Sequence, residues 1–497
     1  MGAPLPLPLP PADPPLVSFP LHTGFQLRDF NGFLKTREDI LKARPNMRTS
    51  WVGAALANSL SGNYSKAFEL VSKANETMKD EAQPPSAYES SEFLLFQNQC
   101  LEKQGKFAEA LAHIKKIAPD VVDVLGLRVK EAELLLLSGQ YEEAQAAWVK
   151  LTSEQSDNYR FHCGMQTAFL RLDAAKSREM LALRRLDLPC TRLALTAEQR
   201  GMLLSMYRSG GTVGSGSATG PSTGGGGGAS LRCPKKIEMT LVGHGAEFRA
   251  LIDAHMRKCC HSGMPALYHD VCSLVTQPDP HDPTVLVPVK DAADFRAHPA
   301  TLVVTELLQG YISSLRATSK FPPSTSASAS ASPSEAPLEP PTTILWAMYL
   351  HAHLLERSGD LQLALSVIDE CIAHTPTAPD MLLKKARILK QCGDPYAAAE
   401  VCDQGRALDL QDRYLNNKAT KYYLRADRVE DAVNTISLFT KHEGDPQQYL
   451  SDMQCSWFEL EAGESACRSK AWGLALKNFH SVKKHFEGQL SSCLFVS

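Results

Sequence analysis

The hexapeptide GDLQLA at residues 359–364 is followed 34 residues later by GDPYAA at residues 393–398. Both begin with Gly-Asp and end in alanine, at Ala364 and Ala398. A third alanine, Ala432, follows after another 34 residues. A glycine in a left-handed conformation ends a helix without steric cost, and a small residue lets the next helix approach closely. Since the flanking residues have the spacing of amphipathic helices, this stretch predicts helical hairpins that recur at a fixed period.

The same pairing of glycine and alanine occurs in the N-terminal part of the chain. The pairs are Gly62 with Ala67, Gly105 with Ala110, and Gly139 with Ala144. This pattern resembles the tetratricopeptide repeat, which implies an all-α fold, an α-solenoid of helical hairpins that forms a right-handed superhelix. We expect repeats near residues 48–81, 91–124, 125–158, 345–378, 379–412, 413–446 and 456–489.

Two low-complexity stretches divide the chain. The first is rich in glycine and serine, and the second is rich in proline, serine and alanine, as expected of linkers. We therefore expect a Pro-rich disordered leader (1–21), N-terminal repeats (22–208), a linker (209–230), degenerate helical repeats (231–320), a second linker (321–341) and C-terminal repeats (342–490). In the middle block, residues 246–257, 265–275 and 300–316 are expected to be helices.

The composition excludes several classes of protein. The 52 basic and 55 acidic residues give a net charge of -3, which argues against specific DNA binding. There is no run of apolar residues long enough to span a membrane. The 13 cysteines follow no disulfide pattern, and the proline-dense start does not fit a signal peptide. We expect a soluble cytoplasmic protein with no membrane partner.

Motifs that would indicate an enzyme are missing. The sequence has no phosphate-binding Gly-Lys-Ser/Thr loop, no Gly-x-Ser-x-Gly and no His-Glu-x-x-His. The segment 258–261, with His269 and Cys272, lacks a Cys-x-x-Cys pair and is expected to be structural rather than metal-binding. A glycine-rich match to an acetyl-coenzyme-A loop at 208–213 is incomplete and lies in the linker. We expect no catalytic residues, no bound metal and no intrinsic cofactor.

Basic residues recur in register in the C-terminal repeats. His353, Arg387 and Lys421 share the ninth position of three successive repeats, a position that generally lines the groove of such a solenoid. A stripe of cations in one groove could capture phosphate or carboxylate groups. The alternative is a solvated face whose cations pair with acidic residues such as Glu356 and Asp427. The candidate anion-binding residues are Arg357, Arg387, Lys390, Arg413, Lys418, Lys421 and Arg425.

Several segments are similar to one family in particular, the large auxiliary subunit of the N-terminal acetyltransferase A (NatA) complex. They are RTSW (48–51), YESSEFLLFQN (88–98), PPTTILW (340–346), DLQDRYLNNK (409–418) and MQCSWF (453–458). The likeness extends over about 25–200 and 231–488. Relative to the family, the chain looks truncated at both ends, and the two low-complexity insertions are foreign to it.

The resemblance implies a non-catalytic, ribosome-anchoring scaffold. In that family the superhelix wraps and activates a small catalytic acetyltransferase subunit for co-translational N-terminal acetylation, and inositol hexakisphosphate binds in a basic pocket at the subunit junction. The stripe at Arg387, Lys421 and Arg425 fits such a pocket in kind.

Two alternatives stay open at this point. One is a general repeat adaptor or co-chaperone that grips C-terminal carboxylates. That class needs particular Lys and Asn residues at the fifth and ninth positions of the first helices. At the fifth position this chain has Val52, Tyr349, Leu383 and Asn417, so the pattern is missing. The other is that the chain transfers acetyl groups itself, for which it offers no strand–loop–helix cofactor site.

Overall fold

The computed structural model describes residues 29–77, 86–182, 195–208, 233–283, 286–323, 338–440 and 444–492. The expected leader (1–21) and first linker (209–230) lie outside the described residues, as do residues 324–337 of the second linker. Among the described residues, no helix is both long and apolar enough to span a lipid bilayer.

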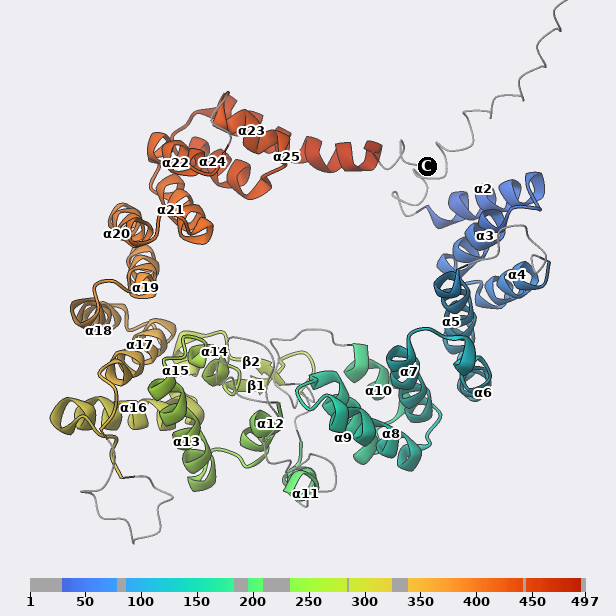
Figure 1. Cartoon of the computed structure of the whole chain (residues 1–497), viewed down its shortest axis with the longest axis horizontal. Coiled ribbons are helices and arrows are strands. Elements are labelled where there is room, and N and C mark those ends of the chain that lie inside the picture. The colour runs from blue at the N-terminus through green and yellow to red at the C-terminus, as the bar shows by residue number, and fades with distance from the viewer. Residues whose placement is uncertain are drawn as a thin grey trace, which may run out of the picture. The chain divides into compact units, whose positions relative to one another are not determined.

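The described residues are mostly helical (Figure 1). They form two compact units. Unit 1 comprises the described residues up to 151, residues 167–179 and residues 486–492, and unit 2 comprises residues 152–166 and the described residues from 180 to 485. The expectation of an all-α solenoid of helical hairpins is confirmed.

Unit 1 begins with a helix that precedes the first expected repeat. Its elements, some of which continue past the unit boundary, are α2 (Phe30–Ala43), α3 (Arg48–Leu60), α4 (Tyr64–Thr77), α5 (Ala87–Lys103), α6 (Phe107–Ile117), η1 (Ala118–Asp120), α7 (Val124–Leu137), α8 (Tyr141–Glu154) and α10 (Ala174–Ala182).

Unit 2 contains the remaining helices and a short β-hairpin. Its elements are α9 (Tyr159–Phe169), α11 (Ala197–Arg208), α12 (Cys233–Leu241), α13 (Ala246–Ser262), α14 (Leu267–Cys272), β1 (Thr276–Pro278), β2 (Leu286–Pro288), α15 (Ala292–Ala297), α16 (Pro299–Thr318), α17 (Thr342–Arg357), α18 (Leu361–His374), α19 (Pro379–Gln391), α20 (Pro395–Leu408), α21 (Arg413–Arg425), α22 (Val429–Ser437), α23 (Pro446–Asp452), α24 (Ser456–Arg468) and α25 (Trp472–Ser492).

Each expected repeat begins within a few residues of a helical hairpin. The hairpins are α3–α4, α5–α6, α7–α8, α17–α18, α19–α20, α21–α22 and α24–α25. The turns have the expected left-handed geometry, with φ angles of 81° at Gly359 and 87° at Gly393. A Cβ atom on Gly393 would meet nothing within 4 Å, so the glycine is needed for its backbone conformation rather than for space.

The turn hydrogen bonds repeat from hairpin to hairpin. The N–H of Gly393 donates to the carbonyl of Lys390 (3.2 Å), and the N–H of Asp394 donates to that of Leu389 (3.1 Å). In the following hairpin Asp427, with a φ of 58°, takes the place of the glycine, and its N–H donates to Leu424 in the same way. Aspartate tolerates this region better than most residues, so the period persists without its glycine.

In six of these seven hairpins the small residue is fully buried. The alanines at this position, all 0% exposed, are Ala67, Ala110, Ala144, Ala364, Ala398 and Ala432. In the C-terminal repeats, Ala398 and Ala432 belong to one core with Leu382, Ala419 and Leu424.

The middle block confirms the expected helices and adds a feature that the sequence analysis missed. Helices α13, α14 and α16 lie where they were expected, but β1 and β2 form an antiparallel pair in which Gln277 lies opposite Val287. This segment contains prolines, including Pro278 and Pro288, which cannot donate a backbone hydrogen bond and exclude a continuous helix. The block is therefore not a simple run of degenerate helical repeats.

We predict that Ala398→Trp destabilises the protein by roughly 1–3 kcal/mol or more, because the larger side chain overfills a helix–helix contact. Urea unfolding of the full chain measures the change. Ala373→Trp, at an exposed alanine of α18, is the matched control and is expected to change stability little. Equal stability of the two variants would contradict the repeat register.

Candidate anion-binding site

The seven candidate basic residues lie on three successive first helices of the C-terminal repeats. Helix α17 carries Arg357, α19 carries Arg387 and Lys390, and α21 carries the other four. These helices belong to the same unit, and they follow one another through the intervening helices α18 and α20 (Figure 1). The repeat therefore places residues that are distant in sequence on successive first helices of the same row.

Four of the seven residues form a charged cluster, which we call the α19–α21 cluster: Arg387, Lys390, Lys421 and Arg425. Arg425 makes a bidentate ion pair with Glu461 of α24, with its Nε 2.9 Å from Oε2 and its Nη2 2.8 Å from Oε1. Lys421 Nζ lies 2.7 Å from the same Oε1. Two cations of the cluster thus share one carboxylate.

The other side of the cluster has its own carboxylate. Arg387 Nε lies 2.7 Å from Oε1 of Glu356, at the end of α17. The side chain of Arg387 is still 54% exposed, whereas that of Glu356 is only 3% exposed. The guanidinium therefore reaches solvent while its counter-ion is held inside the protein.

Lys390 lies within electrostatic range of both arginines. Burial lowers the pKa of Lys390, and the positive charges of Arg425 and Arg387 lower it further. Among the described residues, Lys390 makes no ion pair of its own. A cation that is repelled by neighbouring positive charges favours the binding of an anion, which would relieve the repulsion.

The remaining three candidates have other surroundings. The Nη2 atom of Arg357 donates to the backbone carbonyl of Val289 (2.6 Å), and its guanidinium stacks over Phe295. Arg413 lies over the ring of Phe439, and Lys418 lies over the ring of Tyr414. These contacts set the three residues apart from the α19–α21 cluster.

His353 does not contribute a positive charge to the stripe, contrary to the sequence analysis. Burial, together with the charges of Lys384 and Arg387, lowers the pKa of His353 to about 2. The Nδ1 atom of the neutral ring accepts a hydrogen bond from the ammonium group of Lys384, with 2.8 Å between Nδ1 and Nζ. The in-register position is correct, but burial removes the charge.

The carboxylate that pairs with Arg387 also belongs to a buried ion pair. Lys384 of α19, whose side chain is 2% exposed, contacts Glu356, and Gln391 donates to the same carboxylate (2.7 Å). Burial lowers the pKa of Lys384 to about 8 in spite of this partner. Leaving a buried charge without its partner is strongly destabilising. The contacts with Lys384 and Gln391 therefore hold the carboxylate of Glu356 in one position.

Lys384 and Glu461 are not among the site residues predicted from the sequence. Glu356 was predicted only as a residue that could neutralise the stripe, which is the role that it has toward Arg387. Lys384 and Glu461 each occupy the sixth position of an expected repeat. An alignment of the repeats by position, extended from basic to acidic residues, would have identified Glu461 as a partner of the preceding helix.

The candidate metal segment is packed into the core of unit 2. Cys259 and Cys260 are both 0% exposed, and burial raises the pKa of Cys259 to about 12. A buried, protonated thiol is a poor metal ligand. In the part of the chain that the structure describes, no group of three histidine, cysteine or acidic residues could hold a metal ion.

The fold and the site together define a helical-repeat protein with charged side chains arranged across successive hairpins. A family model for the auxiliary subunit of N-terminal acetyltransferase A matches residues 88–215 and 294–490. The chain belongs to this family, which confirms the resemblance found in the sequence.

Individual relatives support the same assignment. The chain is 32% identical to the N-terminal acetyltransferase A complex auxiliary subunit NAA15 of Arabidopsis thaliana, over 93% of this chain and 44% of that protein. It is 29% identical to the human N-alpha-acetyltransferase 16, NatA auxiliary subunit, over 93% of this chain and 45% of the relative. Both are named as auxiliary subunits, which supports a non-catalytic role.

A solved structure is also similar. The structure of Naa15/Naa10 bound to HypK-THB contains a chain with a TM-score of 0.69 and 25% sequence identity, over 96% of this chain and 61% of that chain. The present chain thus spans less than half the length of the two relatives above.

Proposed function

We propose that this chain is a non-catalytic scaffold that wraps and activates a catalytic N-terminal acetyltransferase subunit. The observation that carries the proposal is the similarity over 96% of the chain to a solved structure in which Naa15 is joined with Naa10. The activity that the complex would have is co-translational N-terminal acetylation, in the cytoplasm and at the ribosome.

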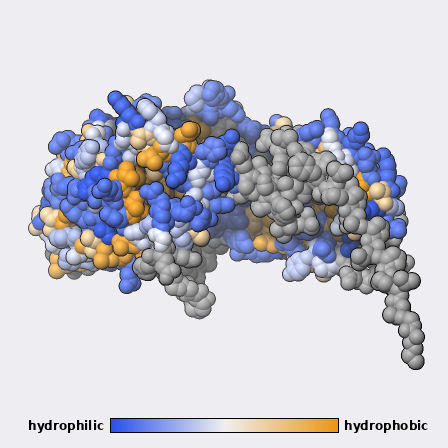
Figure 2. Space-filling view, turned by 90° about the horizontal axis from the view of Figure 1, so that it is seen from above, coloured by the Kyte–Doolittle hydropathy of each residue, from blue (hydrophilic) through white to orange (hydrophobic). Residues whose placement is uncertain are grey.

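The surface of the repeats supports a role in protein binding. Near the α20–α21 connection, Leu408, Leu410 and Tyr414 are 42%, 60% and 58% exposed. On the face drawn in Figure 2, hydrophobic residues lie at the surface among hydrophilic ones. Exposed apolar patches rimmed by polar residues are typical of protein interaction sites.

Co-expression with a Naa10-type catalytic subunit tests the scaffold. We predict that the two chains co-purify as a stable complex and that acetyl transfer to peptides beginning with Ser or Ala differs from that of the catalytic subunit alone. Size-exclusion chromatography and a peptide acetylation assay measure the two effects. The control is the catalytic subunit co-expressed with an unrelated tetratricopeptide protein. Failure to co-purify, with the helical fold intact by circular dichroism, would contradict the proposal and favour a different repeat adaptor.

We further propose that the α19–α21 cluster binds a polyphosphate, with inositol hexakisphosphate as a structural ligand. Support comes from the concentration of four cations around two carboxylates and from the repulsion of Lys390 by two arginines. Arginine binds phosphate groups through paired hydrogen bonds, and lysine binds them as a point charge.

The double variant Arg387→Glu/Lys421→Glu is expected to weaken binding of inositol hexakisphosphate by roughly 100-fold, since each lost charge-assisted contact contributes about 1.5–3 kcal/mol. Isothermal titration calorimetry on the full chain measures the affinity. The control variant Lys477→Glu/Lys484→Glu makes the same change in net charge at two exposed positions of α25. An unchanged affinity in the first variant, or an equal loss in both, would reject the site.

A further inference from the structure

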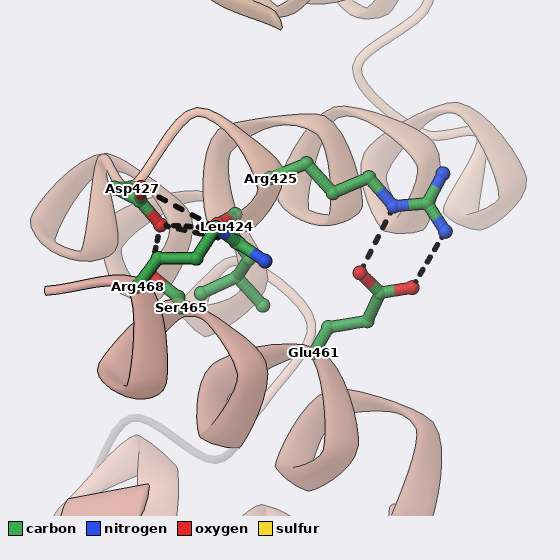
Figure 3. Close-up of polar contacts among 6 residues, drawn as sticks. All are labelled: Leu424, Arg425, Asp427, Glu461, Ser465 and Arg468. Atoms are coloured by element: carbon green, nitrogen blue, oxygen red, sulfur yellow. Dashed lines mark hydrogen bonds and ion pairs between the residues drawn. The ribbon is translucent and has the colours of Figure 1, made fainter. Parts of the chain in front are cut away.

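The interface between α21 and α24 contains two separate charged contacts (Figure 3). In one, Glu461 faces Arg425 and accepts two hydrogen bonds from its guanidinium. In the other, Asp427 in the turn that follows α21 accepts hydrogen bonds from Ser465 (2.8 Å) and Arg468 (3.0 Å), and Arg468 also donates to the carbonyl of Leu424 (2.8 Å). Both contacts join the same two helices, but only Glu461 touches the α19–α21 cluster.

Glu461 is charged and largely shielded from solvent. Its side chain is 9% exposed. Burial alone would raise the pKa of Glu461, but hydrogen bonds from Arg425 and Lys421 outweigh burial and lower the pKa below its usual value. The carboxylate therefore neutralises the two cations that an incoming anion would need.

The two carboxylates of the cluster differ in how firmly they are held. Glu356 is bound from inside by Lys384 and Gln391 as well as by Arg387, so it keeps partners when Arg387 turns away. Within the described part of the chain, the polar contacts of Glu461 are those with Arg425 and Lys421, both of which belong to the cluster. An anion that takes these two cations competes directly with Glu461, whereas Glu356 stays in place.

This difference bears on which anions can bind. A singly phosphorylated or otherwise small anion reaches one or two cations and has to replace a bidentate ion pair, with little gain. An anion with several linked phosphates can contact Lys390 and Arg387 at the same time as Arg425 and Lys421. Binding through several linked groups makes each further contact intramolecular, so a polyphosphate gains much more than a single phosphate.

We propose that Glu461 is a specificity-determining counter-ion that occupies Arg425 and Lys421 until a polyphosphate displaces it. This inference rests on the proposed anion-binding site and adds to it the means by which single phosphates are excluded. Displacement also removes the contact of Glu461 with α21, while the contacts of Arg468 with Asp427 and with the carbonyl of Leu424 remain. Anion binding is therefore coupled to the docking of the α24–α25 hairpin.

The test compares inorganic tripolyphosphate with inorganic phosphate by calorimetry on the full-length chain. Glu461→Gln keeps the size of the side chain and removes its charge. We expect this variant to bind tripolyphosphate about tenfold more tightly, since a competing charge-assisted contact is lost. We expect the affinity for inorganic phosphate to rise by a larger factor, so that the ratio between the two ligands falls.

Asp427→Asn is the matched control. It weakens the neighbouring contact between the same two helices, and asparagine also tolerates the positive φ of this position. The control is expected to leave both affinities unchanged. Glu461→Asp, which keeps the charge, is a second variant and is expected to retain most of the preference for tripolyphosphate. Circular dichroism checks that all variants are folded.

The outcomes separate the inference from the site on which it rests. If Glu461→Gln binds tripolyphosphate no more tightly than the wild type, Glu461 positions the cations rather than competing for them, and the inference is overturned. If Asp427→Asn tightens binding equally, loosening of the helix pair is the cause, which also overturns it. If the wild-type chain binds neither tripolyphosphate nor inositol hexakisphosphate, the proposed anion site itself fails.

Discussion

The close contact between the two helices of each hairpin is the constraint on which the rest of the structure depends. Fully buried alanines such as Ala364, Ala398 and Ala432 leave no space for a larger side chain, and a left-handed turn residue sets the angle at which the second helix returns. Because both features recur at a fixed spacing, each hairpin presents the same face to the next one. The repeat thereby converts a period in sequence into a regular row of helices.

The row of helices explains how the charged residues meet. Glu356 reaches Arg387 on the next first helix of the row, and Arg425 reaches Glu461 on another. Each of these ion pairs joins neighbouring repeats, so the same contacts that concentrate positive charge also hold the repeats in register. Where a charge is deeply buried, as at Lys384, it is paired and its ammonium group also donates to His353. A scaffold built in this way can present a fixed surface to a partner subunit.

Much of the fold could be predicted from the sequence, because a glycine turn and a small residue have local physical causes. The β1–β2 pair could not be predicted, since it lies in a proline-containing connection between helices that does not follow the 34-residue period. For the site, the repeat spacing predicted that Arg387, Lys390, Lys421 and Arg425 lie near one another. The spacing carries no information on burial, which makes His353 neutral. Nor does it report the stacking partners that hold Arg357 and Arg413 elsewhere. The turn at Asp427 could not be predicted from the glycine pattern either, because aspartate adopts the left-handed conformation there in place of glycine.

Ion pairs across neighbouring repeats build the charged cluster. A double-mutant cycle of Arg425→Met and Glu461→Gln, followed by urea unfolding of the full chain, tests this arrangement most directly. A bidentate, partly buried pair predicts a favourable coupling of about 1–3 kcal/mol between the two positions. Additive effects of the two substitutions would show that Arg425 and Glu461 do not interact, and would contradict the register on which this account of the site depends.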